Sequence, residues 1–314
     1  MIVDARPTAG TARLRHLLDV DTLDRTEIAR ICDLAVEMRA ARAARGYRSL
    51  LEAETIGLAF YEASTRTRVS FELAAKALGA TVVDLSIASS SATKGESLVD
   101  TLRTLERTGV STLVLRHAAS GAPYLAARTT SLRVVNAGDG THAHPTQALV
   151  DALTLREHLG TLEGRTVTIV GDVVHSRVAR SNLHALVRLG ARVRLGGPPA
   201  WVRGLDGWPG VEVAPTLEDA LTGADAVMTL RVQLERAAIG GVPSLREYTR
   251  TWGLNEQRMR LAQPGAPILH PGPTNEGVEL TSELASGPRS LIGHQVRNSV
   301  AVRMAVLALV SGAP

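Results

Sequence analysis

The hydrophobic positions of the first half of the chain fall into short apolar runs that alternate with segments of helical spacing. Four β-type runs are predicted, at residues 55–61, 81–86, 111–117 and 132–138. Helical patterns lie between them, at residues 67–78, 96–108 and 121–130. This alternation is typical of parallel sheets covered by helices on both faces.

The second half repeats the alternation. Strands are predicted at residues 165–172, 191–197, 225–231 and 266–272, with helical patterns at 176–189, 216–222 and 255–262. A helix that starts after Pro145 links the halves, and 314 residues suit about two domains. We therefore expect an α/β fold of two doubly wound parallel-sheet domains with a cleft between them.

Composition excludes several other classes of protein. No apolar run is long enough to span a bilayer, because Arg303 interrupts the one that comes nearest, and the N-terminus lacks an apolar signal segment. The net charge of +4 comes without a dense basic block, so no nucleic-acid partner is expected. Cys32 is the only cysteine, so no intrachain disulfide can form and a cytoplasmic location is expected.

The segment STRTR follows the first predicted strand and opens a helix. It supplies Ser64, Thr65, Arg66 and Thr67, all of them donors. Ligands of open parallel sheets bind beyond the carboxyl ends of the strands, where helix N-termini attract anions. No P-loop pattern exists in the chain, so we interpret the segment as a site for a small phosphate rather than a nucleotide.

Polar donors follow the other strands of the first half as well. They are Ser90, Lys94, Arg116, His144 and Gln147. Lys94 is one of only two lysines among 35 basic residues, which favours a need for a compact ammonium there. Such a group of donors can hold a phosphate and polarise a carbonyl, and no metal-binding pattern accompanies it, so neither metal nor cofactor is expected.

The strand ends of the second half carry Arg177, Arg231 and Gln233. Two arginines at one crevice suit a dicarboxylate, since each can bind a carboxylate with two hydrogen bonds. The segment HPGP ends the last strand and predicts a tight turn, with a candidate cis bond between Gly272 and Pro273. The free carbonyls of Pro271 and Gly272 can accept hydrogen bonds from an amide NH₂.

These motifs, in this order, resemble the aspartate carbamoyltransferase catalytic-chain family, from about Leu17 to Leu309. The motifs are STRTR, KGES, VLRH, HPTQ, GDVVHSRVARSN, LRVQLER and HPGP. The resemblance implies transfer of a carbamoyl group from carbamoyl phosphate to the amine of L-aspartate, an early step of pyrimidine synthesis. It also implies a carbamoyl-phosphate-binding domain at 1–145 plus a C-terminal helix at 292–314, and an aspartate-binding domain at 146–291.

The resemblance implies a role for each matched residue. Those that hold the phosphate are Ser64, Thr65, Arg66 and Thr67. Those on the carbamoyl oxygen are Thr67, Arg116 and His144. Those on its NH₂ are Gln147 and the carbonyls of Pro271 and Gly272. Those on the aspartate carboxylates are Arg177, Arg231 and Gln233. Ser90 and Lys94 match a loop lent to the active site of a neighbouring subunit in a homotrimer.

The residue chemistry fits this reaction without a protein base. Attack of an amine on the carbamoyl carbon places negative charge on the carbamoyl oxygen, which the three donors around it would stabilise. The departing phosphate can take the amine proton, so the protein chiefly orients and neutralises two anions.

Some positions depart from the family pattern: Ala63 replaces Pro, Thr93 replaces Lys, Glu276 stands where Arg is frequent, and Asn298-Ser299 replaces Asn-Gly. Glu276 places a carboxylate near an anion pocket, so a different acceptor amine is one alternative. An ornithine enzyme would carry HCLP in place of HPGP. A non-catalytic assembly partner is the other alternative, and the sequence leaves open whether a regulatory chain or a dihydroorotase binds.

Overall fold

The computed structural model describes residues 14–43, 50–85, 97–232 and 244–313. The strands are β1 (Thr55–Phe60), β2 (Thr81–Leu85), β3 (Thr112–His117), β4 (Arg133–Asp139), β5 (Thr166–Val170), β6 (Arg192–Gly196), β7 (Val211–Val213), β8 (Ala226–Thr229) and β9 (Ile268–Leu269). The helices are α1 (Arg25–Ala43), α2 (Thr65–Ala77), α3 (Leu98–Arg107), α4 (Ala122–Thr129), α5 (Pro145–Leu159), α6 (Arg177–Arg188), α7 (Pro199–Val202), α8 (Leu217–Leu221), α9 (Leu245–Trp252), α10 (Glu256–Met259), α11 (Ser282–Ser286) and α12 (Ile292–Ser311).

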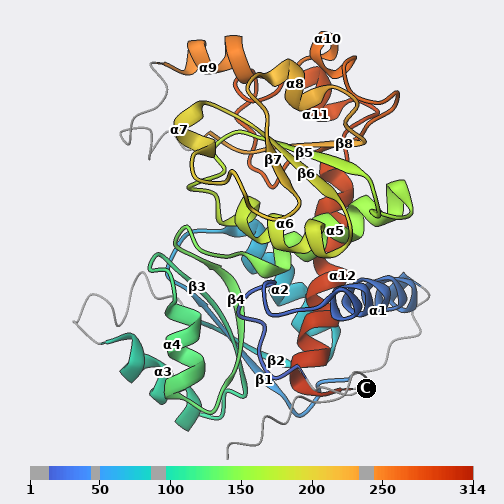
Figure 1. Cartoon of the computed structure of the whole chain (residues 1–314). Helices are drawn as coiled ribbons and strands as arrows, with labels where there is room; N and C mark the ends of the chain where they lie inside the picture. Colours follow the sequence, from blue (N-terminus) through green and yellow to red (C-terminus); the bar gives the residue numbers. More distant parts are fainter. Residues whose placement is uncertain (1–13, 44–49, 86–96, 233–243, 314) are drawn as a thin grey trace, which may run out of the picture.

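The strands form two separate sheets, each wholly parallel. The first has the order β2-β1-β3-β4, and the second has the order β7-β6-β5-β8-β9. In Figure 1 the first sheet lies below the second, with α5 and α6 between them. In the first sheet the chain proceeds from β1 to β2 on one side and from β3 to β4 on the other. In the second sheet β6 and β7 lie on one side of β5, and β8 and β9 lie on the other. Each sheet therefore has a topological switch point, the place where ligands commonly bind in open parallel sheets.

Helices cover both faces of the first sheet (Figure 1). Helix α4 packs on β3 and β4 and contacts α3, while α2 packs on β1 and β2 and contacts α12. Helix α12 also packs against α1 and α5, so the last helix of the chain returns to the first sheet. Thirteen of its residues are buried, Val302, Val306 and Val310 among them. The fold predicted from the alternation is confirmed.

The predicted strands are all found. The elements that pattern reading omitted include the short strand β7, helix α9 and the long helix α1, which buries Ile28, Ile31 and Ala35. Strand β7 contains three residues and lies at the edge of its sheet. Helix α9 has only one buried residue, Tyr248. The apolar run that Arg303 interrupts, which the sequence indicated is too short to span a bilayer, is the buried helix α12. Among the described residues, no helix is both long and apolar enough to cross a membrane.

Candidate active site

The strands at the two switch points carry the arginines predicted to bind substrate. Arg66 lies in the first turn of α2, directly after β1, and Arg116 lies in β3 near its carboxyl end. In the second sheet, Arg177 is the first residue of α6, and Arg231 follows β8. Each sheet therefore presents two arginines at the edge where parallel-sheet proteins bind ligands.

The start of α2 leaves polar groups available for an anion. Ser64 is the N-cap residue, yet its side chain makes no capping hydrogen bond in the described structure. Thr65 and Arg66 are exposed, whereas Thr67 is buried at 7% exposure. The first N–H groups of a helix have no partner within the helix, so together with these side chains they favour a negatively charged ligand.

Arg66 lies directly against the turn that follows β9. Gly272 has a φ of +64°, and a Cβ placed on it would stand 2.9 Å from Cζ of Arg66. Partial burial of the guanidinium, and then the positive charge of Arg231, lower the pKa of Arg66. The guanidinium of the first sheet thus lies within the field of an arginine from the second sheet. The Gly272–Pro273 bond is cis, as the sequence suggested.

Arg116 and Arg177 come together around a second glycine. Gly138 has a φ of +115°, and a Cβ there would lie 3.1 Å from both Nη1 of Arg116 and Nε of Arg177. Arg116 Nη1 donates to the carbonyl of Ala137 at 3.3 Å. Only a residue without a side chain lets both guanidinium groups approach the end of β4 so closely.

Glu62 joins these two arginines and was not singled out from the sequence. Its Oε2 lies 2.7 Å from Nη1 of Arg177 and 3.6 Å from Nε of Arg116. All three side chains are largely buried, at 22% exposure for Glu62 and 13% for each arginine. Glu62 therefore adds a carboxylate to a group of residues from which only hydrogen-bond donors were predicted. Glu62 lies two residues after the end of β1. The same position after a strand is what singled out Ser64 to Thr67 in the sequence, so it could have indicated Glu62 as well.

His144 caps the start of α5 and is buried at 4% exposure. Its backbone N–H donates to Ser181 Oγ at 2.9 Å, whereas its ring atom Nδ1 has no hydrogen-bond partner among the described residues. Burial, reinforced by the charges of Arg116 and Arg177, holds the pKa of His144 well below its usual range. The imidazole is therefore neutral at physiological pH and can donate one hydrogen bond without adding charge.

Gln147 follows His144 by one turn of α5, and its Nε2 donates to Asp151 Oδ1 at 2.8 Å. Pro271 and Gly272 lie partly exposed in the turn against Arg66. Ser90, Lys94 and Gln233 lie outside the described residues, as does Thr93.

The departures at Glu276 and Ser299 have local structural partners. Glu276 is exposed, and its Oε2 accepts a hydrogen bond from Ser282 Oγ at 2.9 Å. Ser299 Oγ donates to the Val296 carbonyl at 2.7 Å, and Asn298 beside it is buried, with Nδ2 donating to Glu157 Oε2 at 2.7 Å.

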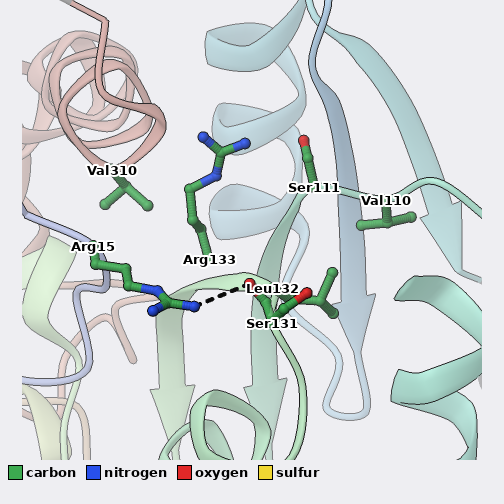
Figure 2. Close-up of a pocket in the computed structure, with 7 residues that line it drawn as sticks. All are labelled: Arg15, Val110, Ser111, Ser131, Leu132, Arg133 and Val310. Carbon is green, nitrogen blue, oxygen red and sulfur yellow. Dashed lines mark hydrogen bonds between the residues drawn. The ribbon is translucent and has the colours of Figure 1, made fainter. Parts of the chain in front are cut away.

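A cavity of about 590 Å³ opens at the opposite edge of the first sheet, where β3 and β4 begin (Figure 2). Its arginines already bond within the protein. Arg133 pairs with Glu54 at 2.6 Å and donates to the Ser311 carbonyl at 3.0 Å, and Arg15 donates to the Ser131 carbonyl. We assign no ligand to this cavity. Within the described part of the chain, no cluster of three or more His, Cys, Asp or Glu side chains is arranged to hold a metal.

Two family models together match nearly the whole chain. Residues 15–157 match the aspartate/ornithine carbamoyltransferase carbamoyl-P binding domain, and residues 163–310 match the Asp/Orn binding domain of the same family. The chain belongs to the aspartate/ornithine carbamoyltransferase family. The resemblance carried by the seven motifs is thereby confirmed.

Curated relatives place the chain beside the aspartate branch of this carbamoyltransferase family. It is 52% identical over 310 residues to the aspartate carbamoyltransferase catalytic subunit of Gluconacetobacter diazotrophicus, covering 98% of this chain and 97% of that one. It is 53% identical over 294 residues to the corresponding subunit of Granulibacter bethesdensis, covering 93% of each.

Solved structures of other carbamoyltransferases have the same fold. The aspartate transcarbamoylase of Trypanosoma cruzi, in complex with carbamoyl phosphate and aspartate, superimposes with a TM-score of 0.84 at 30% identity, covering 94% of this chain and 95% of that one. The ornithine carbamoyltransferase of Pyrococcus furiosus gives a TM-score of 0.86 at 28% identity, covering 96% and 98%. The backbone alone therefore does not distinguish the two acceptors.

Proposed function

We propose that this protein transfers the carbamoyl group of carbamoyl phosphate to the amine of L-aspartate. The products are N-carbamoyl-L-aspartate and phosphate, which places the reaction early in pyrimidine synthesis. The observation that carries the proposal is the convergence of guanidinium groups from both sheets, with Arg116 and Arg177 around Gly138 and Arg66 against Gly272. Positive charge at this density suits two small anions bound side by side.

The first anion is carbamoyl phosphate at the start of α2. Its phosphate takes the helix N–H groups and the side chains of Ser64, Thr65, Arg66 and Thr67. Arg116 and neutral His144, with Thr67, donate to the carbamoyl oxygen, where negative charge develops as the amine attacks. A single donor of this kind is worth about 10²–10³ in rate.

The second anion is L-aspartate, held by Arg177, Arg231 and Gln233. The amine proton passes to the departing phosphate, so no side chain of the protein serves as general base. L-Ornithine would bring an ammonium group where the dicarboxylate brings a carboxylate. Its positive charge would face the arginines without a partner, which disfavours it as acceptor.

We extend the proposal to the assembly and to the location of the protein. Ser90 and Lys94 complete the site of a neighbouring subunit in a homotrimer located in the cytoplasm. Residues 1–145 with 292–314 form the carbamoyl-phosphate-binding domain, and residues 146–291 form the aspartate-binding domain. Packing of α12 against α1 and α2 supports this division.

Phosphate release from carbamoyl phosphate, measured with a panel of amines, tests the proposed function. L-Aspartate should support turnover, and L-ornithine and L-glutamate should support at least a hundredfold less. Turnover with another amine would show that the acceptor has changed. No turnover with any amine would favour a non-catalytic assembly partner.

A further inference from the structure

Asp151 is a fully buried carboxylate that three side-chain amides surround. It lies on α5, four residues after Gln147, at 0% exposure. Its Oδ1 accepts from Gln147 Nε2 at 2.8 Å and from Gln295 Nε2 at 2.7 Å, and its Oδ2 accepts from Asn182 Nδ2 at 2.9 Å. Because an ionised carboxylate only accepts hydrogen bonds, each amide must turn its NH₂ toward Asp151 and its oxygen away.

The surroundings of Asp151 keep it ionised. Burial raises the pKa of Asp151 to about 6, while the hydrogen bonds from the amides and the charge of Arg303 act in the opposite direction. Arg303 is itself buried, with its guanidinium 4.9 Å from the centre of the Phe71 ring. Burial lowers the pKa of Arg303 to about 9, so it still carries its charge at neutral pH. An ionised Asp151 therefore fixes the direction of the Gln147 amide.

Gln295 extends this arrangement to the turn after β9. Its Oε1 accepts from the backbone N–H of His270 at 3.0 Å, so one amide connects α5 to the turn. His270 Nδ1 accepts from the N–H of Gly272 at 2.7 Å, and its Nε2 lies 3.1 Å from Glu279 Oε1. Nδ1 must then be unprotonated and Nε2 must carry the proton. The Gly272 N–H is therefore bonded to His270, and this bond fixes the conformation of the turn that lies against Arg66.

We propose that Asp151, acting through Gln147 and Gln295, is a positioning residue that selects an acyl phosphate bearing an NH₂ group. The inference rests on the proposed function and concerns the donor substrate. With its NH₂ turned toward Asp151, Gln147 presents its oxygen on the other side, as an acceptor for the NH₂ of carbamoyl phosphate. Acetyl phosphate has the same phosphate and carbonyl but carries a methyl group there, and leaves that acceptor unpaired.

An unpaired acceptor in a closed site weakens binding by roughly tenfold to a hundredfold. The Asp151→Asn substitution keeps the size of the side chain but replaces one acceptor oxygen with a donor. The three surrounding amides then meet too few acceptors. Where the new NH₂ takes the side of Oδ1, the Gln147 amide can satisfy it only by reversing. A reversed Gln147 turns its NH₂ toward the ligand. The NH₂ of carbamoyl phosphate then faces another donor and loses its hydrogen bond, whereas the methyl group of acetyl phosphate has no hydrogen bond to lose.

The test compares the dissociation constants of carbamoyl phosphate, acetyl phosphate and inorganic phosphate, measured by titration calorimetry. Asp151→Asn should weaken carbamoyl phosphate about tenfold or more and should change the other two by less than about threefold. Asp33→Asn is the matched control, because Asp33 pairs with Arg156 at the surface of α1 and touches none of these amides. It should leave all three constants unchanged.

Gln295→Met provides a second variant that keeps Asp151 intact. It removes the bonds to Asp151 and to His270 while nearly preserving side-chain volume. His270 leads into the turn whose Pro271 and Gly272 carbonyls are assigned to the NH₂ of carbamoyl phosphate, so a loss selective for carbamoyl phosphate is expected through the turn. Equal weakening of all three ligands in the folded variants, or no weakening in either, would overturn the proposal. The measurement requires binding only, so a protein that binds these ligands without transferring a carbamoyl group would refute the proposed function and still decide this inference.

Discussion

Glu62 holds two arginines that the proposed reaction needs for different substrates. In the proposed reaction Arg116 binds the carbamoyl oxygen and Arg177 binds an aspartate carboxylate, yet both lie beside one carboxylate of the protein. The guanidinium groups would otherwise repel each other across Gly138. Glu62 therefore reduces this repulsion and helps to orient both arginines.

Replacing Glu62 with Gln should raise the KM for L-aspartate by about tenfold to a hundredfold, since a hydrogen bond to a charged group is worth about 1.5–3 kcal/mol. Steady-state kinetics at saturating carbamoyl phosphate measures this effect. Glu276→Gln is the control, because that carboxylate is exposed and bonds to Ser282. A larger effect at Glu276 than at Glu62 would contradict the assignment and would point to a role for Glu276 in acceptor choice.

The buried imidazole of His144 makes stability depend on pH. The unfolded chain binds a proton at this residue near pH 6.5, whereas the folded protein, in which the pKa of His144 is well lowered, does not. The stabilisation is therefore complete above about pH 6.5 and is lost as the pH falls, at up to about 1.4 kcal/mol per pH unit. Urea unfolding at pH 7.5, 6.5 and 5.5 should show the wild-type advantage over His144→Gln shrinking in acid.

His158 is the matched control for this measurement, because it is an exposed histidine on the same helix. His158→Gln should leave the pH dependence of unfolding close to that of the wild type. A difference between the wild type and His144→Gln that stays constant across the three pH values would mean that His144 titrates alike in both states.

At the scale of elements, the conformation of the turn after β9 affects the position of Arg66, which belongs to the first sheet. Gly272→Ala should cost about 1–2 kcal/mol for placing a side chain at positive φ. It should also weaken phosphate binding by about tenfold, because the new Cβ would displace Arg66. Thermal unfolding and phosphate titration measure the two effects separately.

Gly265→Ala separates backbone strain from contact with the site. Gly265 has a φ of +77°, and nothing lies within 4 Å of a Cβ built on it. This variant should lose similar stability and retain full affinity for phosphate. If it also loses phosphate affinity, the effect at Gly272 arises from general destabilisation and not from Arg66.

The elements that could be read from the sequence are those with a clear local pattern. Strand β5 is buried at every position, and all five of its residues, TVTIV, are β-branched, which favours a strand. Strand β7 was missed because it has three partly buried or exposed residues, and α9 because its burial rests on Tyr248 alone. Where the local pattern is weak, tertiary packing decides the structure, and a single sequence does not show that packing.

At the scale of the molecule, the convergence of donors followed from topology alone, since the carboxyl ends of parallel strands share one edge. The pairings could not be predicted. Gln295 and Asp151 are 144 residues apart, and neither residue type indicates which amide will meet which carboxylate. Glu62 was missed for the same reason, because its partner Arg177 is 115 residues away.

The proposed shared site predicts recovery of activity in mixed oligomers. Arg66→Ala and Lys94→Ala should each inactivate the protein, because the proposed site needs both cations and takes them from different subunits. Subunits of the two variants, separated, mixed and reassembled, should regain up to about a third of wild-type activity, since only sites that draw both residues from intact copies function. Hybrids that stay inactive while each parent remains folded and trimeric would show that Lys94 does not act across a subunit boundary.

Helix α12 has a consequence for how the chain acquires its structure during synthesis. It fills the space between α1, α2 and α5, and it supplies Arg303 beside Phe71 and Gln295 beside Asp151. The first sheet is translated early, but it cannot close its interior until residues 292–311 have left the ribosome. A nascent chain of this protein must therefore keep an open apolar surface for most of its translation, which makes it a natural client for chaperones that bind growing polypeptides.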